Sequence, residues 1–144
     1  MDAQIEHLSK LPNPLVAVVD LISQGKLLQA EELCKEFMHL NPRYVEGMRL
    51  LADVAMRLGV LDDAEFLLES AIELEPDNTR LRIDYIGVLR KRQQFEKALS
   101  QAKILLESQS DNLQFRSIFA IECMQSGDFE RAVAEFNAIL QLLP

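Results

Sequence analysis

The stretch Leu58–Pro76, LGVLDDAEFLLESAIELEP, decides the fold of this 144-residue chain. Gly59 stands near its start, Ala64 and Ala71 follow seven residues apart, and Pro76 ends it. Glycine can take the left-handed conformation that closes a helix, whereas proline cannot continue one. The stretch therefore predicts a turn, a helix with small residues on one face, and a second turn.

The same pattern recurs along the whole chain with a period of 34 residues. Alanine occupies all four equivalent positions, while glycine and proline each occupy three of four, with Gln93 and Ser110 as the exceptions. The aligned sets are Ala30, Ala64, Ala98 and Ala132; Gly25, Gly59 and Gly127; and Pro42, Pro76 and Pro144. A fixed period of this length is typical of proteins built from stacked helical hairpins.

Composition agrees with an all-α protein and restricts its partners. Helix formers dominate, 49% of residues are hydrophobic, and tryptophan is absent. The net charge of −8 repels phosphate groups, so we expect neither nucleic acid nor an anionic membrane surface as partner. The chain shows neither a signal peptide nor a long apolar run, which predicts a cytoplasmic protein. Cys34 and Cys123 match no metal or redox spacing and are expected in the core.

Apolar spacing and the punctuating residues predict eight helices in four pairs. Their expected ranges are Asn13 to Gln24 with Leu27 to Leu40, Val45 to Leu58 with Leu61 to Leu74, Thr79 to Arg92 with Phe95 to Ser108, and Leu113 to Ser126 with Phe129 to Leu142. We expect Asn78 and Asn112 to cap the helices that follow them. Asp62 is expected to cap its helix together with Glu65, as in a capping box.

This pattern resembles the tetratricopeptide repeat (TPR) family, in which each 34-residue unit is an antiparallel helix-turn-helix. The resemblance covers residues 11–144 and implies an α-solenoid, a right-handed superhelix, with repeats at 11–44, 45–78, 79–112 and 113–144. Residues 1–10 would form a short helix or a disordered segment. The third repeat departs most, because Ile86 replaces a small residue, Gly87 interrupts a helix, and Gln93 and Ser110 replace the punctuating residues. We expect it to be the least stable repeat.

In this family the first helices of successive repeats line a concave groove, and the resemblance implies which residues face it. The candidate peptide-binding residues are Arg49, Asp53, Met56, Arg57, Arg80, Ile83, Arg90, Lys91, Ser117, Ile121, Met124 and Gln125, with Glu46 and Gln114 beside them. Five cations against two anions make this groove basic, and methionine and isoleucine add adaptable apolar contacts. The expected ligand is a peptide with acidic and apolar residues. The alternative is that these are ordinary solvated charges on amphipathic helices.

A family subset that clamps chaperone C-termini with Lys and Asn is disfavoured, because the first repeat is apolar at Leu15 and Val19 and no Asn falls at these groove positions. Catalytic and phosphate-binding motifs are also missing, so we expect neither an enzyme nor a cofactor. His7 and His39 stand apart from other metal ligands. The acidic run from Asp62 to Glu75 could mark a cation site but is more typical of a solvated helix face.

Three functions are consistent with this pattern. The first is a scaffold that binds a protein or peptide in the groove. The second is a non-catalytic regulatory or substrate-presenting arm of a larger bacterial enzyme, because residues 41–78 look similar to the repeat region that precedes a sulfotransferase domain in some bacterial proteins. The third is a spacer that self-associates through Phe129 to Leu143, a helix with more apolar residues than one inner face requires. The same surplus would also suit further repeats.

Overall fold

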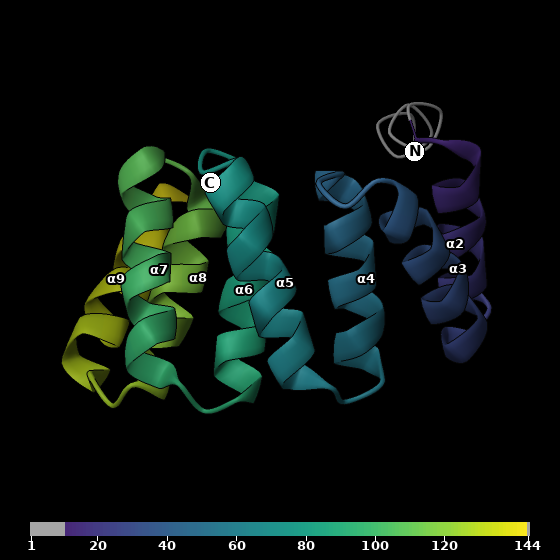
Figure 1. The fold of residues 1–144 in the computed structure, drawn as a ribbon. Coiled ribbons are helices and arrows are strands. Elements are labelled where there is room, and N and C mark those ends of the chain that lie inside the picture. The colour runs from purple at the N-terminus through teal and green to yellow at the C-terminus, as the bar shows by residue number, and fades with distance from the viewer. Residues whose placement is uncertain (1–10, 144) are drawn as a thin grey trace. The chain divides into compact units, whose positions relative to one another are not determined.

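The structure, a computed structural model, describes residues 11–143; residues 1–10, with His7 and the expected N-terminal segment, and Pro144 lie outside the described residues. All regular secondary structure in the described part is helical (Figure 1). The helices are α2 (Asn13–Ser23), α3 (Leu27–Leu40), α4 (Val45–Arg57), α5 (Leu61–Leu74), α6 (Thr79–Lys91), α7 (Phe95–Ser108), α8 (Leu113–Gln125) and α9 (Phe129–Leu142). The all-α prediction is confirmed. The first helix of each pair ends one residue earlier than expected, and the second helices match.

The helices form two compact units, which divide between Pro76 and Asp77. The first unit contains α2 to α5 and the second contains α6 to α9. In each unit, consecutive helices pack against one another, so that every hairpin also contacts the next hairpin of its unit. Each unit is therefore a pair of stacked helix-turn-helix repeats.

The turn inside each hairpin has a left-handed residue, as the glycine pattern predicted. Gly25, Gly59 and Gly127 have φ angles of 74°, 82° and 92°. Gln93 keeps the same turn without glycine, with a φ of 60°. The turn of the third repeat thus keeps the left-handed backbone of the other turns. Because glutamine has a side chain, this conformation is strained at Gln93.

The recurring alanines lie in the core. Ala30, Ala64, Ala98 and Ala132 are all buried. A methyl side chain at each of these positions lets a neighbouring helix approach closely, and larger apolar residues fill the space on either side. In the first unit these larger residues include Leu15, Val18, Leu50 and Val54. Cys34 and Cys123 are also buried, which confirms their predicted place in the core.

The predicted helix caps are confirmed at two positions and wrong at a third. The side chains of Asn78 and Asn112 accept hydrogen bonds from the third residue of their helices, Leu81 and Phe115. Asp62 does not cap α5: its carboxylate accepts a hydrogen bond from the backbone of the neighbouring Asp63.

The cause is the tightness of the preceding turn. The Val60 amide donates to the Ala55 carbonyl at 2.8 Å, so α5 begins at Leu61 and Val60 is its N-cap. Asp62 therefore lies within the first turn of the helix. In the fourth repeat the position of Val60 is taken by Asp128, whose side chain does accept a hydrogen bond, from the Arg131 amide. Sequence reasoning missed this cap.

Gly87 does not interrupt its helix as we expected. α6 is continuous from Thr79 to Lys91, and a Cβ atom added at Gly87 would meet nothing within 4 Å. Flanking turns of α6 bury Leu81, Ile86 and Leu89, and this packing outweighs the weak helix propensity of one glycine. Across residues 11–143, none of the helices is both long and apolar enough to cross a bilayer. The cytoplasmic location stays a prediction.

Candidate functional site

The residues expected in the groove lie on the first helices of repeats two, three and four, and they divide between the two units. α4 of the first unit carries Arg49, Asp53, Met56 and Arg57; in the second unit α6 carries Arg80, Ile83, Arg90 and Lys91, and α8 carries Ser117, Ile121, Met124 and Gln125. The eight residues of the second unit share one pair of neighbouring repeats, so the candidate site lies in this unit.

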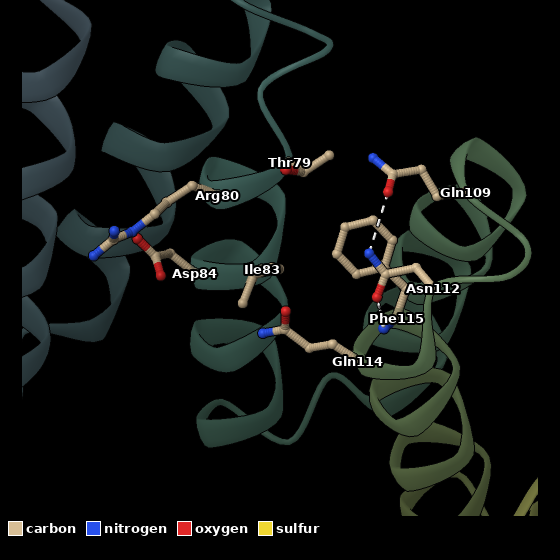
Figure 2. A pocket seen from close by; sticks show the side chains of 8 residues that line it. All are labelled: Thr79, Arg80, Ile83, Asp84, Gln109, Asn112, Gln114 and Phe115. Carbon is tan, nitrogen blue, oxygen red and sulfur yellow. Dashed lines mark hydrogen bonds between the residues drawn. The ribbon is translucent and has the colours of Figure 1, made fainter. Parts of the chain in front are cut away.

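A pocket of about 460 Å³ opens between the N-terminal halves of α6 and α8 (Figure 2). Its lining residues are Thr79, Arg80, Ile83 and Asp84 from α6, Gln109 and Asn112 from the turn before α8, and Gln114 and Phe115 from α8. Figure 2 shows Gln114 reaching from α8 toward the side of α6 that carries Ile83. The pocket thus offers a guanidinium, amides and a carboxylate around a small apolar surface.

The wall on the α8 side is fixed by hydrogen bonds of Asn112. Its side-chain oxygen accepts from the Phe115 amide at 3.1 Å, and its side-chain nitrogen donates to Gln109 Oε1 at 3.2 Å. Arg116 adds a hydrogen bond of 2.8 Å to the Ser110 carbonyl in the same turn. Because the turn is held from both sides, the wall on the α8 side is pre-organised for a ligand.

Sequence reasoning placed Arg80, Ile83 and Gln114 at this site and missed the other lining residues. Asn112 was identified only as a cap, and Gln109 lies just beyond the end of α7. The alignment with the family's repeat assigns groove positions on the first helices only, so it gives no role to the turn before α8. Asn112 was the available signal for this turn, because a residue that caps α8 lies at the same end of the unit as the N-terminal halves of α6 and α8.

Most of the cations expected in the groove are already paired. Arg49 is only 8% exposed and binds Glu46 at 2.6 Å, while Arg57 binds Asp53 at 3.1 Å. Arg90 Nε donates to Glu122 Oε1 at 2.6 Å. Glu122 is fully buried, and the expected charge count had omitted it; including it lowers the positive excess by one.

Two cations remain for an external ligand. In the part of the chain that the structure describes, no ion pair or hydrogen bond is found for the side chains of Arg80 and Lys91, and both residues are exposed. On α8, Met124 and Gln125 are exposed too. Ser117 is less available, because its hydroxyl donates to the Leu113 carbonyl at 2.9 Å.

The thiols are poorly suited to act as nucleophiles. Burial raises the pKa of the Cys34 thiol to about 11. Burial also raises the pKa of Cys123, against a smaller opposing effect of the Arg131 charge. A thiol that stays protonated at neutral pH reacts slowly. Among residues 11–143, no group of three or more His, Cys, Asp or Glu side chains could hold a metal ion.

Comparison with known proteins agrees with this architecture. The model of the family described as the cytochrome c-type biogenesis protein H TPR domain matches residues 33–144. Among solved structures, MamA of AMB-1 is 22% identical with a TM-score of 0.78, over 90% of this chain and 76% of that one. MamA from Desulfovibrio magneticus RS-1 is 14% identical with a TM-score of 0.79, over 90% and 73%.

A tetratricopeptide repeat protein from Parabacteroides merdae is 21% identical with a TM-score of 0.80, over 90% of this chain and 52% of that one. These likenesses confirm the expected TPR-type solenoid fold. The similarity to sulfotransferase repeat regions gains no support from these matches.

Proposed function

The chain belongs to the family of the cytochrome c-type biogenesis protein H TPR domain, and from this premise we propose that it is a scaffold that binds a segment of another protein. In the second unit, the proposed binding surface is the face formed by α6 and α8 around their shared pocket. The observation that carries the proposal is a pair of exposed cations on α6, Arg80 and Lys91, on either side of Ile83, for which no partner is found among residues 11–143.

The spacing of the two cations suggests the form of the ligand. Arg80 and Lys91 are eleven residues apart, which places them on one face of α6 with a rise of about 16 Å between them. An extended peptide covers this length with about five residues. The proposed ligand therefore carries two carboxylates about five residues apart, with an apolar residue between them that contacts Ile83.

Backbone recognition would come from the amide side chains. The Gln114 amide offers both a donor and an acceptor and is exposed on α8. The Asn112 oxygen and the Gln109 oxygen already accept hydrogen bonds, from the Phe115 amide and from Asn112, so these two residues mainly shape the pocket. This division of roles favours an extended segment, whose backbone groups are not already used in a helix.

We test this with a labelled peptide that has two glutamates five positions apart and leucine between them. Arg80→Glu and Lys91→Glu should each weaken its binding at least about tenfold, since an attraction becomes a repulsion. Lys103→Glu is the matched control, because Lys103 is also exposed but lies on α7. Fluorescence anisotropy measures all four proteins. Equal binding by the three variants and the parent protein would show that the α6 and α8 face is not the binding surface.

We propose in addition that the outer face of α9 contacts another protein surface. Phe129, Val133 and Leu140 are all well exposed there, and large apolar residues gathered on one helix commonly mark an interface. Val133→Ser with Leu140→Ser should abolish any concentration-dependent increase in sedimentation coefficient. Sedimentation of the parent protein that does not change with concentration would argue against self-association through this helix.

A further inference from the structure

The first unit has an apolar furrow, which we define as the two adjoining cavities between α3 and α5. The larger cavity has a volume of about 550 Å³ and the smaller about 220 Å³. Both cavities are lined by Leu51, Phe66 and Leu67, so these three residues form their shared boundary. This furrow lies on the second helices of the repeats and is distinct from the first-helix positions of the expected groove.

Helix α4 forms the floor of the furrow through Met48, Leu51 and Ala55, and α3 and α5 form its walls. Because consecutive helices of these hairpins run antiparallel, α3 and α5 run parallel to each other above α4. Such a groove between two helices over a third has the shape that accepts another helix.

Gly47 leaves room for one of the residues that line the furrow. A Cβ atom there would clash with Met38 Sδ, so the glycine allows the Met38 side chain to lie close against α4. Met38 lines the larger cavity. A thioether side chain adapts readily to the shape of an apolar ligand.

Phe66 gives the furrow an unpartnered apolar anchor. Its side chain lines both cavities and is 68% exposed. An exposed aromatic side chain at the centre of an apolar surface is the type of residue that dominates binding energy at interfaces.

The charges around the furrow favour a basic ligand. Helix α5 carries five acidic residues and no basic one. Asp63 and Glu73 border the furrow, and within residues 11–143 neither carboxylate forms an ion pair. On the opposite wall Lys35 is paired with Glu31 at 3.6 Å, and Arg43 lies at the end near Glu73. Residues 11–76 contain twelve acidic and five basic side chains, whereas residues 77–143 contain nine of each.

From the cavities, the exposed Phe66 and the acidic wall, we propose that the furrow binds an amphipathic helix of a partner protein, with an apolar stripe flanked by lysine or arginine. Asp63 and Glu73 are ten residues apart, about 15 Å along α5, which corresponds to about three turns of a bound helix. The basic residues of the partner lie on the side that faces α5. Leucine-sized residues of the stripe contact Phe66 and Leu51.

A second copy of this chain is a poorer occupant. Helix α9 has the most exposed apolar side chains of the helices in residues 11–143, but its charged residues are Glu130, Arg131 and Glu135. The net negative charge of α9 would meet the acidic wall of α5. Charge complementarity therefore selects a basic partner over self-association at this site.

The test uses a fluorescein-labelled peptide of about four helical turns, with leucine at helical spacing and lysine on the flanks. A second peptide replaces every lysine with glutamate. Fluorescence anisotropy with the full chain should show the lysine peptide binding at least about tenfold more tightly, with a difference that shrinks as salt is added. Equal affinity of the two peptides would overturn the proposed charge selection.

Variants then locate the site. Phe66→Ala, and Asp63→Lys with Glu73→Lys, should each weaken the lysine peptide at least about tenfold. The controls are Leu28→Ala, which removes a 71% exposed leucine of α3 that lines neither cavity, and Glu107→Lys on α7; both should change affinity less than about twofold. Unchanged circular dichroism shows that the variants fold. Unchanged affinity of Phe66→Ala would overturn the proposal.

Two more measurements separate the furrow from the α6 and α8 face and from a dimer interface. Arg80→Glu, on the second unit, should leave the lysine peptide unaffected, so this inference stands or falls independently of the proposed function. Sedimentation of the chain alone tests the second copy as occupant. A dimer that Phe66→Ala dissociates would show that a second copy covers the furrow and would overturn the proposal of a basic partner.

Discussion

Removing the Arg90 side chain should strongly destabilise the second unit, because it leaves a buried carboxylate without its partner. Glu122 is fully buried, and Arg90, on the neighbouring repeat, binds its Oε1 atom. Among the described residues no hydrogen-bond partner is found for Glu122 Oε2. In repeats two and three the equivalent positions are Val54 and Val88, both fully buried, and in repeat one the position is the exposed Asp20. Glu122 is thus a carboxylate buried at a position that the two preceding repeats fill with valine.

The magnitude follows from the exposure of the two partners. Breaking a fully buried ion pair costs about 3 to 5 kcal/mol, since the remaining charge cannot be solvated. The Arg90 side chain is 37% exposed, so solvent already screens part of the attraction. We expect Arg90→Met to cost about 2 to 4 kcal/mol. Adding Glu122→Val should recover most of this loss, because valine suits the site and no buried charge remains.

Urea unfolding followed by circular dichroism measures the cycle formed by the parent protein, the two single variants and the double variant. Hydrogen exchange of the α8 amides shows that the change occurs in the second unit. The control is Arg57→Met, which removes the exposed ion pair with Asp53 on α4 and should cost less than about 1 kcal/mol.

Two results would refute this reasoning. If Arg90→Met cost no more than Arg57→Met, the burial of Glu122 would not carry the energy assigned to it. If the double variant were as unstable as Arg90→Met alone, the loss would come from the packing of the Arg90 stem and not from an unpaired carboxylate.

Four further outcomes follow from the backbone and the thiols. Gly87→Ala should stabilise the second unit by about 0.5 to 1 kcal/mol in urea unfolding, because α6 is continuous there and the added Cβ has room; a loss of stability would contradict the free space at this position. Gln93→Gly should raise the midpoint of urea unfolding, because glycine removes a left-handed strain of about 1 kcal/mol, and Gly59→Gln should lower the midpoint by introducing it. Equal midpoints for the two variants would refute the strain. A thiol reagent at neutral pH should label Cys34 and Cys123 only after unfolding, and rapid native labelling would disprove their burial. The unfolded thiol ionises near a pKa of about 8.5 and the folded Cys34 near a pKa of about 11, so stability should fall as pH rises between these values, as checked by unfolding at several pH values.

Local chemistry made the helices predictable. Glycine at the hairpin turns, asparagine before α6 and α8, and proline beyond α5 each act within a few residues of their own position. For this reason the second helices matched their expected ranges. Asp62 shows the limit of such reasoning: whether an acidic residue caps a helix depends on how tightly the preceding turn closes, and a shift of two residues changes its role.

The site was less predictable, because the alignment with the family's repeat shows which side of a helix a residue is on but not which side chains it contacts. Two of the residues that it selected, Arg80 and Ile83, line the α6 and α8 pocket, and their role in binding stays a prediction. It could not show that Arg90 is committed to Glu122, since this pair joins two repeats across 32 residues. Nor could it reveal the furrow, whose walls come from α3 and α5 with α4 between them.

The sequence alone determined the helices between residues 11 and 143, their order and the small residues buried between them, because these depend on local conformational preference and on a repeated pattern. Tertiary structure alone decided which charges are free. An arginine on a helix surface looks the same in sequence whether it faces water, as Arg80 does, or a buried carboxylate from the next repeat, as Arg90 does. That difference is a matter of distance and solvation between residues far apart in the chain, and it exists only once the hairpins are stacked.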